Sequence, residues 1–233
     1  MARIEVQTEK TDPRLVHKAK EIGALLEQVY GRPAPRKRLG PLDELVLTIL
    51  SQHTSDANSD RAFESLRARF PTWEAVRNAP EEEIADAIKS GGLATMKAPR
   101  IKALLMRLTE ERGSLDLDFL YDLNLASARE YLLAIPGVGP KTAACVLLFS
   151  CNKPAFPVDT HVHRVSRRLG LIELRTSADE AHRILESMVP EEEVYAFHVN
   201  LITHGRRVCK APRPLCDRCV LAPVCDFFAA NQQ

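Results

Sequence analysis

The spacing of apolar residues predicts helices along almost the whole chain. Between residues 15 and 29 apolar side chains recur three or four positions apart, which places them on one face of a helix. The same spacing further along predicts helices near residues 97–112, 127–135, 140–151, 160–169, 177–189 and 191–204. No alternating run of β-branched residues is long enough to predict a strand. We therefore expect an all-α protein of about ten helices joined by short turns.

Polar residues mark the start of two of these helices. Pro80 precedes three glutamates, whose charge suits the first turn of a helix. Thr176, followed by Asp179 and Glu180, predicts a capping box with Thr176 as the N-cap.

Two segments interrupt the helical pattern and predict domain crossings. Gly31–Pro41 concentrates proline, glycine and positive charge, and Asn152–Pro157 is a second candidate. If both segments are crossings, residues 34–153 form one helical domain. Residues 1–33 and 154–233 then form a second, discontinuous domain.

The balance of charges excludes several classes of protein. The 32 Lys and Arg residues nearly match the 31 Asp and Glu residues, giving a net charge of +1. This argues against a histone-like basic binder and against an acidic disordered tail. No apolar run approaches the roughly 18 residues that a membrane helix needs, and the N-terminus lacks the apolar stretch of a signal peptide. We therefore expect a cytoplasmic protein without a membrane partner.

A tight turn joins two apolar helices at Ile135–Lys141, in the sequence IPGVGPK. Gly137, Val138 and Gly139 lie where the second helix begins. Free backbone N–H groups at a helix N-terminus favour an anion such as a DNA phosphate. A plain turn between two helices would have the same sequence, so an isolated Gly-x-Gly does not separate the two interpretations.

Lys141 and Asp159 are the candidate catalytic residues. A lysine in the first turn of a helix faces the positive end of the helix dipole, which favours loss of its proton. A neutral amine can attack a sugar carbon and form a Schiff base. Asp159 lies just ahead of the next helix, where it is either an N-cap alone or also a carboxylate that stabilises a developing cation.

Four of the six cysteines crowd into the last part of the chain: Cys209, Cys216, Cys219 and Cys225. Four thiolates match either a tetrahedral zinc ion or an iron–sulfur cluster, and the spacing alone does not separate them. The other two cysteines, Cys145 and Cys151, belong to an apolar segment, and we expect them to be buried and inert.

The motifs in this order resemble the endonuclease III family of DNA glycosylases. The matching segments are IPGVGPKTA, PVDTHVHRV, the terminal Cys-x6-Cys-x2-Cys-x5-Cys, ILSQHTSD at Ile49–Asp56 and IKSGGLATMKA at Ile88–Ala98. The resemblance extends from about Leu15 to the C-terminus.

This resemblance implies a fold and an activity. The fold is a six-helix barrel domain with a helix-hairpin-helix motif, plus a domain that holds a [4Fe–4S] cluster on the four cysteines. Lys141 would attack C1′ of a damaged nucleotide, Asp159 would assist loss of the base, and β-elimination would cut the strand. The partner would be duplex DNA with damaged bases, chiefly oxidised pyrimidines, or abasic sites. We expect a monomer, associated with a bacterial nucleoid.

The resemblance also implies contacts with DNA outside the catalytic pair. The candidates that fill the space of an extruded base are His53, with Gln52 beside it, and Leu93. Lys210 and Arg213, between the first two cysteines, would contact the DNA backbone. The chain departs from the best-known bacterial pattern at His53, Ala94, Thr95 and Leu133, which affects the range of lesions rather than the chemistry.

Three other functions fit parts of the sequence. A monofunctional glycosylase shares the fold, but such relatives usually lack a lysine at position 141. A non-enzymatic helix-hairpin-helix protein would use the turn only to bind phosphates, and the placement of Asp159 argues against it. A zinc-stabilised regulator would use the four cysteines alone.

Overall fold

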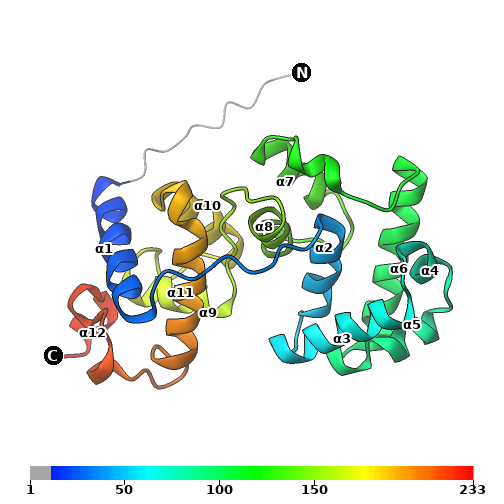
Figure 1. Cartoon of the computed structure of the whole chain (residues 1–233). Helices are drawn as coiled ribbons and strands as arrows, with labels where there is room; N and C mark the ends of the chain where they lie inside the picture. Colours follow the sequence, from blue (N-terminus) through cyan, green and yellow to red (C-terminus); the bar gives the residue numbers. More distant parts are fainter. Residues whose placement is uncertain (1–11, 233) are drawn as a thin grey trace. The chain divides into compact units, whose positions relative to one another are not determined.

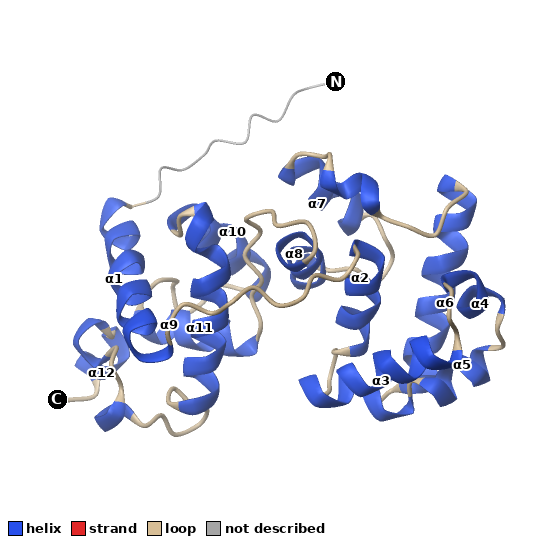
Figure 2. Cartoon of the chain, viewed as in Figure 1, coloured by secondary structure: helices blue, strands red, loops and turns tan. Residues whose placement is uncertain are grey.

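The computed structural model describes residues 12–232, and the regular elements among them are all helical (Figure 1). They comprise twelve α-helices and five short 3-10 helices. Figure 2 shows loops between these helices and no strand in this part of the chain. The prediction of an all-α protein is confirmed, although the structure contains more α-helices than we expected.

The chain divides into two compact units. One is Pro35–Pro157, which we call the central unit. The other joins the N-terminal segment up to Ala34 to the segment that begins at Val158, and we call it the terminal unit.

The central unit is built from consecutive helices. Its α-helices are α2 (Pro41–Leu50), α3 (Asp56–Arg69), α4 (Trp73–Asn78), α5 (Glu81–Ala87), α6 (Ala94–Arg112), α7 (Leu125–Leu133) and α8 (Pro140–Phe149). Its 3-10 helices are η1 (Lys89–Gly91) and η2 (Asp118–Tyr121).

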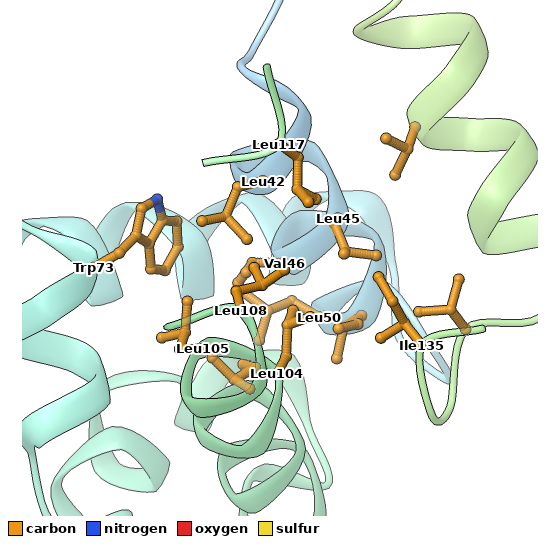
Figure 3. Close-up of a cluster of buried hydrophobic side chains, with 14 of the residues drawn as sticks. Leu42, Leu45, Val46, Leu50, Trp73, Leu104, Leu105, Leu108, Leu117 and Ile135 are labelled. Carbon is orange, nitrogen blue, oxygen red and sulfur yellow. The ribbon is translucent and has the colours of Figure 1, made fainter. Parts of the chain in front are cut away.

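Helix α2 is buried along almost its whole length. Every residue of α2 except Asp43 is buried, and the helix packs against α8, α3 and α6. Figure 3 shows Leu45 and Leu50 of α2 in one cluster with Leu108 of α6 and with Ile135. Each fully buried side chain of this size contributes about 1.5–3 kcal/mol relative to leaving it in water. The core of the central unit therefore forms around α2. No helix in the described part of the chain is long and apolar enough to cross a bilayer.

The terminal unit joins both ends of the chain. Its α-helices are α1 (Pro13–Tyr30), α9 (Thr160–Leu169), α10 (Ala178–Met188), α11 (Val194–Arg207) and α12 (Asp226–Ala230). Its 3-10 helices are η3 (Glu191–Glu193), η4 (Cys216–Arg218) and η5 (Ala222–Val224).

Helix α11 packs against both α1 and α9 (Figure 1). The close approach to α9 requires Gly205, because a Cβ atom there would lie 3.0 Å from Cβ of His161 and 3.2 Å from Cγ2 of Val165. Lys18 of α1 forms an ion pair with Asp226 of α12. These contacts connect segments from opposite ends of the sequence.

The start of α10 differs from the prediction. Its N-cap is Ser177, whose hydroxyl accepts a hydrogen bond from the Glu180 N–H at 3.2 Å. Thr176 is buried, and its carbonyl oxygen accepts a hydrogen bond from Nε2 of His163 at 2.9 Å. The capping box at Thr176 was wrong by one residue, because either hydroxyl can cap a helix and tertiary packing decides between them.

The two cysteines of the central unit differ in exposure. Cys145 is buried within α8, whereas Cys151 is only partly buried just after it. Burial raises the pKa of the Cys151 thiol to about 11, so it keeps its proton at neutral pH.

Glu44 is a carboxylate inside the core, 2% exposed. It forms an ion pair with Arg36, and Thr48 donates a hydrogen bond to its Oε1 at 3.4 Å. Burial raises the pKa of Glu44 above its ordinary value of 4.5, although Arg36, Thr48 and Lys141 lower it. Because the unfolded chain ionises first, the free energy of unfolding falls as the pH rises above about 4.5.

We expect Glu44→Gln to reduce this fall, because glutamine does not titrate. Urea denaturation at several pH values between about 4.5 and 7 measures it. The exposed Glu82, changed to Gln, is the control. If the free energy of unfolding fell equally with pH in the wild type and in Glu44→Gln, the raised pKa of Glu44 would not be the cause of the fall.

Candidate active site and cysteine pocket

The turn between α7 and α8, residues 134–139, is tightly held by its own backbone. We call it the hairpin turn. The Val138 N–H donates to the Ile135 carbonyl oxygen at 3.0 Å, and the Val138 side chain is 6% exposed. Gly137 has a φ of 81°, in the left-handed region that favours glycine. Val138 therefore anchors the turn, while the two glycines lie at its surface.

The hairpin turn presents free donors at the start of α8. Among the residues that the structure describes, the N–H groups of Gly137 and Gly139 have no hydrogen-bond acceptor. Gly139 is the N-cap residue of α8, a helix of 10 residues. Unpaired N–H groups and the positive end of the helix dipole occur together at the start of α8, which favours an anion.

Lys141 is the second residue of α8 and is partly buried. Its amine forms no hydrogen bond or ion pair with the residues described here. The carboxylate of Glu44, on the neighbouring α2, is near enough that Lys141 contributes to lowering the pKa of Glu44. An amine without a fixed partner remains available to a ligand.

Asp159 belongs to the terminal unit, whereas Lys141 belongs to the central unit. Asp159 is the N-cap of α9, and its Oδ1 accepts a hydrogen bond from the Val162 N–H at 2.7 Å. Its Oδ2 has no hydrogen-bond partner in the described part of the chain. Capping therefore uses one carboxylate oxygen, fixes the side chain and leaves the other oxygen available.

Two exposed loops of the central unit contain non-glycine residues in a left-handed conformation. We call residues 51–55 the first loop and residues 91–93 the second loop. His53 has a φ of 56° and Leu93 a φ of 50°. Such backbone costs about 1–3 kcal/mol and tends to occur at functional sites. Leu93 is 48% exposed, so it is not an ordinary core leucine.

Three residues at which the chain departs from the best-known bacterial sequence pattern are sequence neighbours of the second loop or of the hairpin turn. Ala94 is the first residue of α6 and packs against the core, and Thr95 beside it is exposed. Leu133 ends α7 and is 41% exposed.

The sequence did not indicate two cations of α6 that contact these segments. Lys97 donates to the carbonyl oxygen of Leu50, just ahead of the first loop, and to that of Gly91, the first residue of the second loop. Arg100 donates to Gln52 and to the Gly137 carbonyl oxygen. Burial lowers the pKa of Lys97, and Arg100 lowers it further. Their spacing of three residues on a helix was the only available signal, because it places both on one face.

The four clustered cysteines line one small pocket in the terminal unit. Its remaining lining is mostly apolar and includes Val208, Leu215, Phe227 and Phe228. Within residues 12–232, no group of three or more His, Cys, Asp or Glu side chains is placed so that it could hold a single metal ion. The four thiols thus surround a common space without closing on one point.

Two side chains contact the sulfur atoms of this pocket. Nη1 of Arg168 lies 3.3 Å from Sγ of Cys209, and Nε2 of His204 lies 3.5 Å from Sγ of Cys219. His204 Nδ1 is 3.0 Å from the Tyr30 hydroxyl, and burial lowers the pKa of His204 to about 4.

Burial raises the pKa of two of the pocket thiols, Cys219 and Cys225, and the neighbouring cysteines raise it further. These thiols are therefore protonated unless a metal displaces the proton.

The loop between the first two cysteines exposes positive charge. Lys210 and Arg213 are both exposed. Nη1 of Arg168 donates to the Lys210 carbonyl oxygen at 2.9 Å, so the same arginine contacts a pocket cysteine and the loop.

Comparisons with known proteins identify the family. Residues 46–191 match the HhH-GPD (helix-hairpin-helix) superfamily of base excision DNA repair proteins. Endonuclease III of Thermotoga maritima is 37% identical over 196 residues, 84% of this chain and 87% of that protein. A putative DNA glycosylase of Arabidopsis thaliana is 42% identical over 165 residues, 71% of this chain but only 56% of that protein.

A solved structure has a similar fold. It is a trapped covalent intermediate of endonuclease III with DNA, in an estranged-adenine complex, with a TM-score of 0.78 and 28% identity. The match covers 94% of this chain and 99% of that one. The chain therefore belongs to the HhH-GPD superfamily of base excision DNA repair proteins, and within it to the endonuclease III family.

The two glycines of the hairpin turn offer a matched pair of substitutions. A Cβ atom at Gly137 would lie 2.6 Å from Nη2 of Arg100, whereas nothing lies within 4 Å of a Cβ at Gly139. We expect Gly137→Ser to lower the free energy of unfolding by about 1–2 kcal/mol, because serine resists the left-handed conformation. Gly139→Ser should change it by less than about 0.5 kcal/mol, because serine is a good N-cap.

Urea denaturation checks both variants, and equal stabilities would contradict this account of the turn. DNA binding by Gly139→Ser is then informative by itself. Weaker binding at unchanged stability would show that a ligand approaches the backbone closely at this position.

Proposed function

We propose that the protein is a bifunctional DNA glycosylase and AP lyase that removes oxidised pyrimidines from duplex DNA. The observation that carries the proposal is the half-buried, unpartnered amine of Lys141 beside the free N–H groups of Gly137 and Gly139. This combination supports a nucleophile that acts close to a site for a DNA phosphate. The covalent DNA intermediate of the similar endonuclease III structure supports the same chemistry.

The proposed reaction begins with attack of the neutral Lys141 nitrogen on C1′ of the damaged nucleotide. The new C–N bond forms as the bond to the base breaks, and the base leaves with a proton. The Oδ2 atom of Asp159, free of the helix cap, stabilises the positive charge that develops on the sugar. The attacking nitrogen loses a proton, and the C1′–O4′ bond then breaks, so that the sugar ring opens and an imine forms between Lys141 and C1′. Loss of a proton from C2′ then breaks the bond from C3′ to its phosphate oxygen, which cuts the DNA strand on the 3′ side of the lesion. The sugar stays on Lys141 until water hydrolyses the imine.

The target base must leave the helix before Lys141 can reach C1′, which costs a few kcal/mol. His53 and Leu93, in the first and second loops, would fill the vacated space, with Gln52 beside them. Both residues have a left-handed backbone and are exposed, Leu93 to 48%. Because damaged bases stack poorly, extrusion favours them over normal bases.

We propose that Cys209, Cys216, Cys219 and Cys225 hold a [4Fe–4S] cluster. A single zinc ion needs its sulfur ligands about 2.3 Å from one point. The four thiols line one pocket, and the spacing of the four cysteines matches that of the endonuclease III family, which supports a cluster rather than a zinc ion. The cluster would fix the loop that exposes Lys210 and Arg213, so that their charges meet the DNA backbone.

In this proposal the central unit is the six-helix barrel domain with the helix-hairpin-helix motif. The terminal unit is the cluster domain, and it supplies Asp159. The protein acts as a monomer on DNA.

Borohydride reduction tests the lysine. We expect wild-type protein to be trapped covalently on duplex DNA with one oxidised pyrimidine, because borohydride reduces the imine to a stable amine. Lys141→Ala should abolish trapping, while Lys20→Ala, at an exposed position of α1, should not change it. Trapping by Lys141→Ala at the wild-type level would disprove the lyase assignment, and base release without trapping in the wild type would favour a monofunctional glycosylase.

The same duplex tests Asp159 through base release. Asn caps helices as well as Asp does, so Asp159→Asn should keep the wild-type stability and DNA affinity. Base excision should fall by at least about a hundredfold. Near-normal turnover would mean that Asp159 only caps α9.

Metal analysis of protein purified without oxygen tests the cluster. We expect iron and acid-labile sulfide in equal amounts, with their loss in Cys216→Ser and their retention in Cys145→Ser. Stoichiometric zinc in the native protein would overturn the assignment.

A further inference from the structure

Lys97 is an almost fully buried cation, 2% exposed, near the start of α6. Its amine donates to the carbonyl oxygen of Leu50 at 2.7 Å and to that of Gly91 at 2.8 Å. Leu50 is the last residue before the first loop, and Gly91 begins the second loop. One ammonium group thus holds the backbone of both loops at the point where each begins.

Arg100 extends this connection to the hairpin turn. It lies one helical turn after Lys97, on the same face of α6. Its Nη1 donates to the Gln52 side chain at 3.0 Å, and its Nη2 donates to the Gly137 carbonyl oxygen at 2.8 Å. Arg100 therefore joins the first loop to the hairpin turn.

These hydrogen bonds explain how the strained backbone is held. The left-handed residue His53 comes three positions after Leu50, and Leu93 comes two positions after Gly91. Strained backbone persists only where the surrounding structure fixes it. A charged donor forms stronger hydrogen bonds than a neutral one, and a buried carbonyl oxygen that loses such a donor is left without a partner, which destabilises the segment that contains it.

The hydrogen bond from Arg100 to the hairpin turn also depends on the absence of a side chain at Gly137. A Cβ at this position would meet the Arg100 guanidinium at 2.6 Å from Nη2. The absence of a side chain at Gly137 therefore lets Arg100 reach the carbonyl oxygen.

We propose that Lys97 and Arg100 are positioning residues, which hold the first loop, the second loop and the hairpin turn in the arrangement that binds DNA. This inference rests on the proposed function of the three segments. All the bonds lie within the central unit. The free protein then pays the cost of ordering the loops during folding rather than during binding, which increases affinity and the rate of base extrusion.

The test uses variants that separate the hydrogen-bonding geometry of these two residues from their positive charge. Arg100→Lys keeps the positive charge, but a single ammonium group does not reproduce the planar fork that reaches two acceptors. Arg100 is exposed, so this variant should fold. Lys97→Met removes the buried donor, and Lys102→Met is its matched control. Lys102 lies on the same helix and donates to the Ala79 carbonyl oxygen at 2.7 Å, away from the three segments.

The measurements use a duplex with a single oxidised pyrimidine and 2-aminopurine as the neighbouring base. Single-turnover base release gives the rate of excision, and 2-aminopurine fluorescence reports unstacking. We expect Arg100→Lys to slow both by about tenfold, at unchanged melting temperature. Lys97→Met and Lys102→Met should both lower the melting temperature, and only Lys97→Met should slow unstacking by about tenfold or more.

A double-mutant cycle between Gln52→Ala and Arg100→Lys provides an independent check. If the bridge acts, the two effects are not additive, because either change breaks the same contact. Additive effects, or wild-type unstacking in Arg100→Lys, would overturn the proposal even if Lys97→Met does not fold.

The wild-type control distinguishes this proposal from the proposed function. If the wild type releases no base and is not trapped by borohydride on any lesion duplex, the proposed function fails. If the wild type is active and Arg100→Lys matches it in both readouts, only the positioning role fails.

Discussion

The burial of α2 is the constraint on which the central unit depends. A helix that is apolar on nearly all sides has to be enclosed, and α8, α3 and α6 enclose it. This packing determines where the segments of the candidate site lie within the central unit. The C-terminal end of α2 leads into the first loop. Helix α8 follows the hairpin turn directly and carries Lys141, and α6 carries the cations that connect the loops. The core thereby fixes the positions of segments that have little burial of their own.

In the described part of the central unit, two charged side chains are buried, Glu44 and Lys97. Glu44 forms an ion pair with Arg36 and lies near Lys141, and Lys97 donates hydrogen bonds to two backbone carbonyl oxygens. Buried charges are costly unless they are paired or hydrogen-bonded. Both buried charges lie close to the candidate site. Functional sites are where proteins commonly accept the energetic cost of burying a charge.

Much of the helical architecture could be predicted from the sequence, because helical periodicity is a local property. The helix predicted over 160–169 is α9, whose bounds are Thr160–Leu169. The prediction was less accurate where alternatives compete locally, as at the start of α10, where Ser177 rather than Thr176 is the N-cap. The second loop shows a different limit: no local pattern predicts the left-handed backbone of Leu93, or the hydrogen bond that Lys97 donates to the Gly91 carbonyl oxygen two residues earlier.

Some residues of the candidate site could likewise be predicted from the sequence, and others could not. Lys141, Asp159 and the cysteines were found because they belong to motifs with fixed spacing, and the roles assigned to them remain predictions. Lys97 and Arg100 were missed because a lysine or arginine on a helix is usually solvated. Only the structure shows that Lys97 is 2% exposed.

Helix α9 connects Asp159 to the cysteine pocket, although the sequence motifs of the two are far apart. Asp159 caps its N-terminus, and Arg168, in its last turn, contacts Cys209 in the cysteine pocket. A helix of 10 residues spans about 15 Å, and its backbone is stiff over that length. A displacement of Arg168 in the pocket therefore acts on the same stiff helix whose first turn Asp159 caps, so the orientation of the carboxylate and the order of the cysteine pocket are properties of one rigid element.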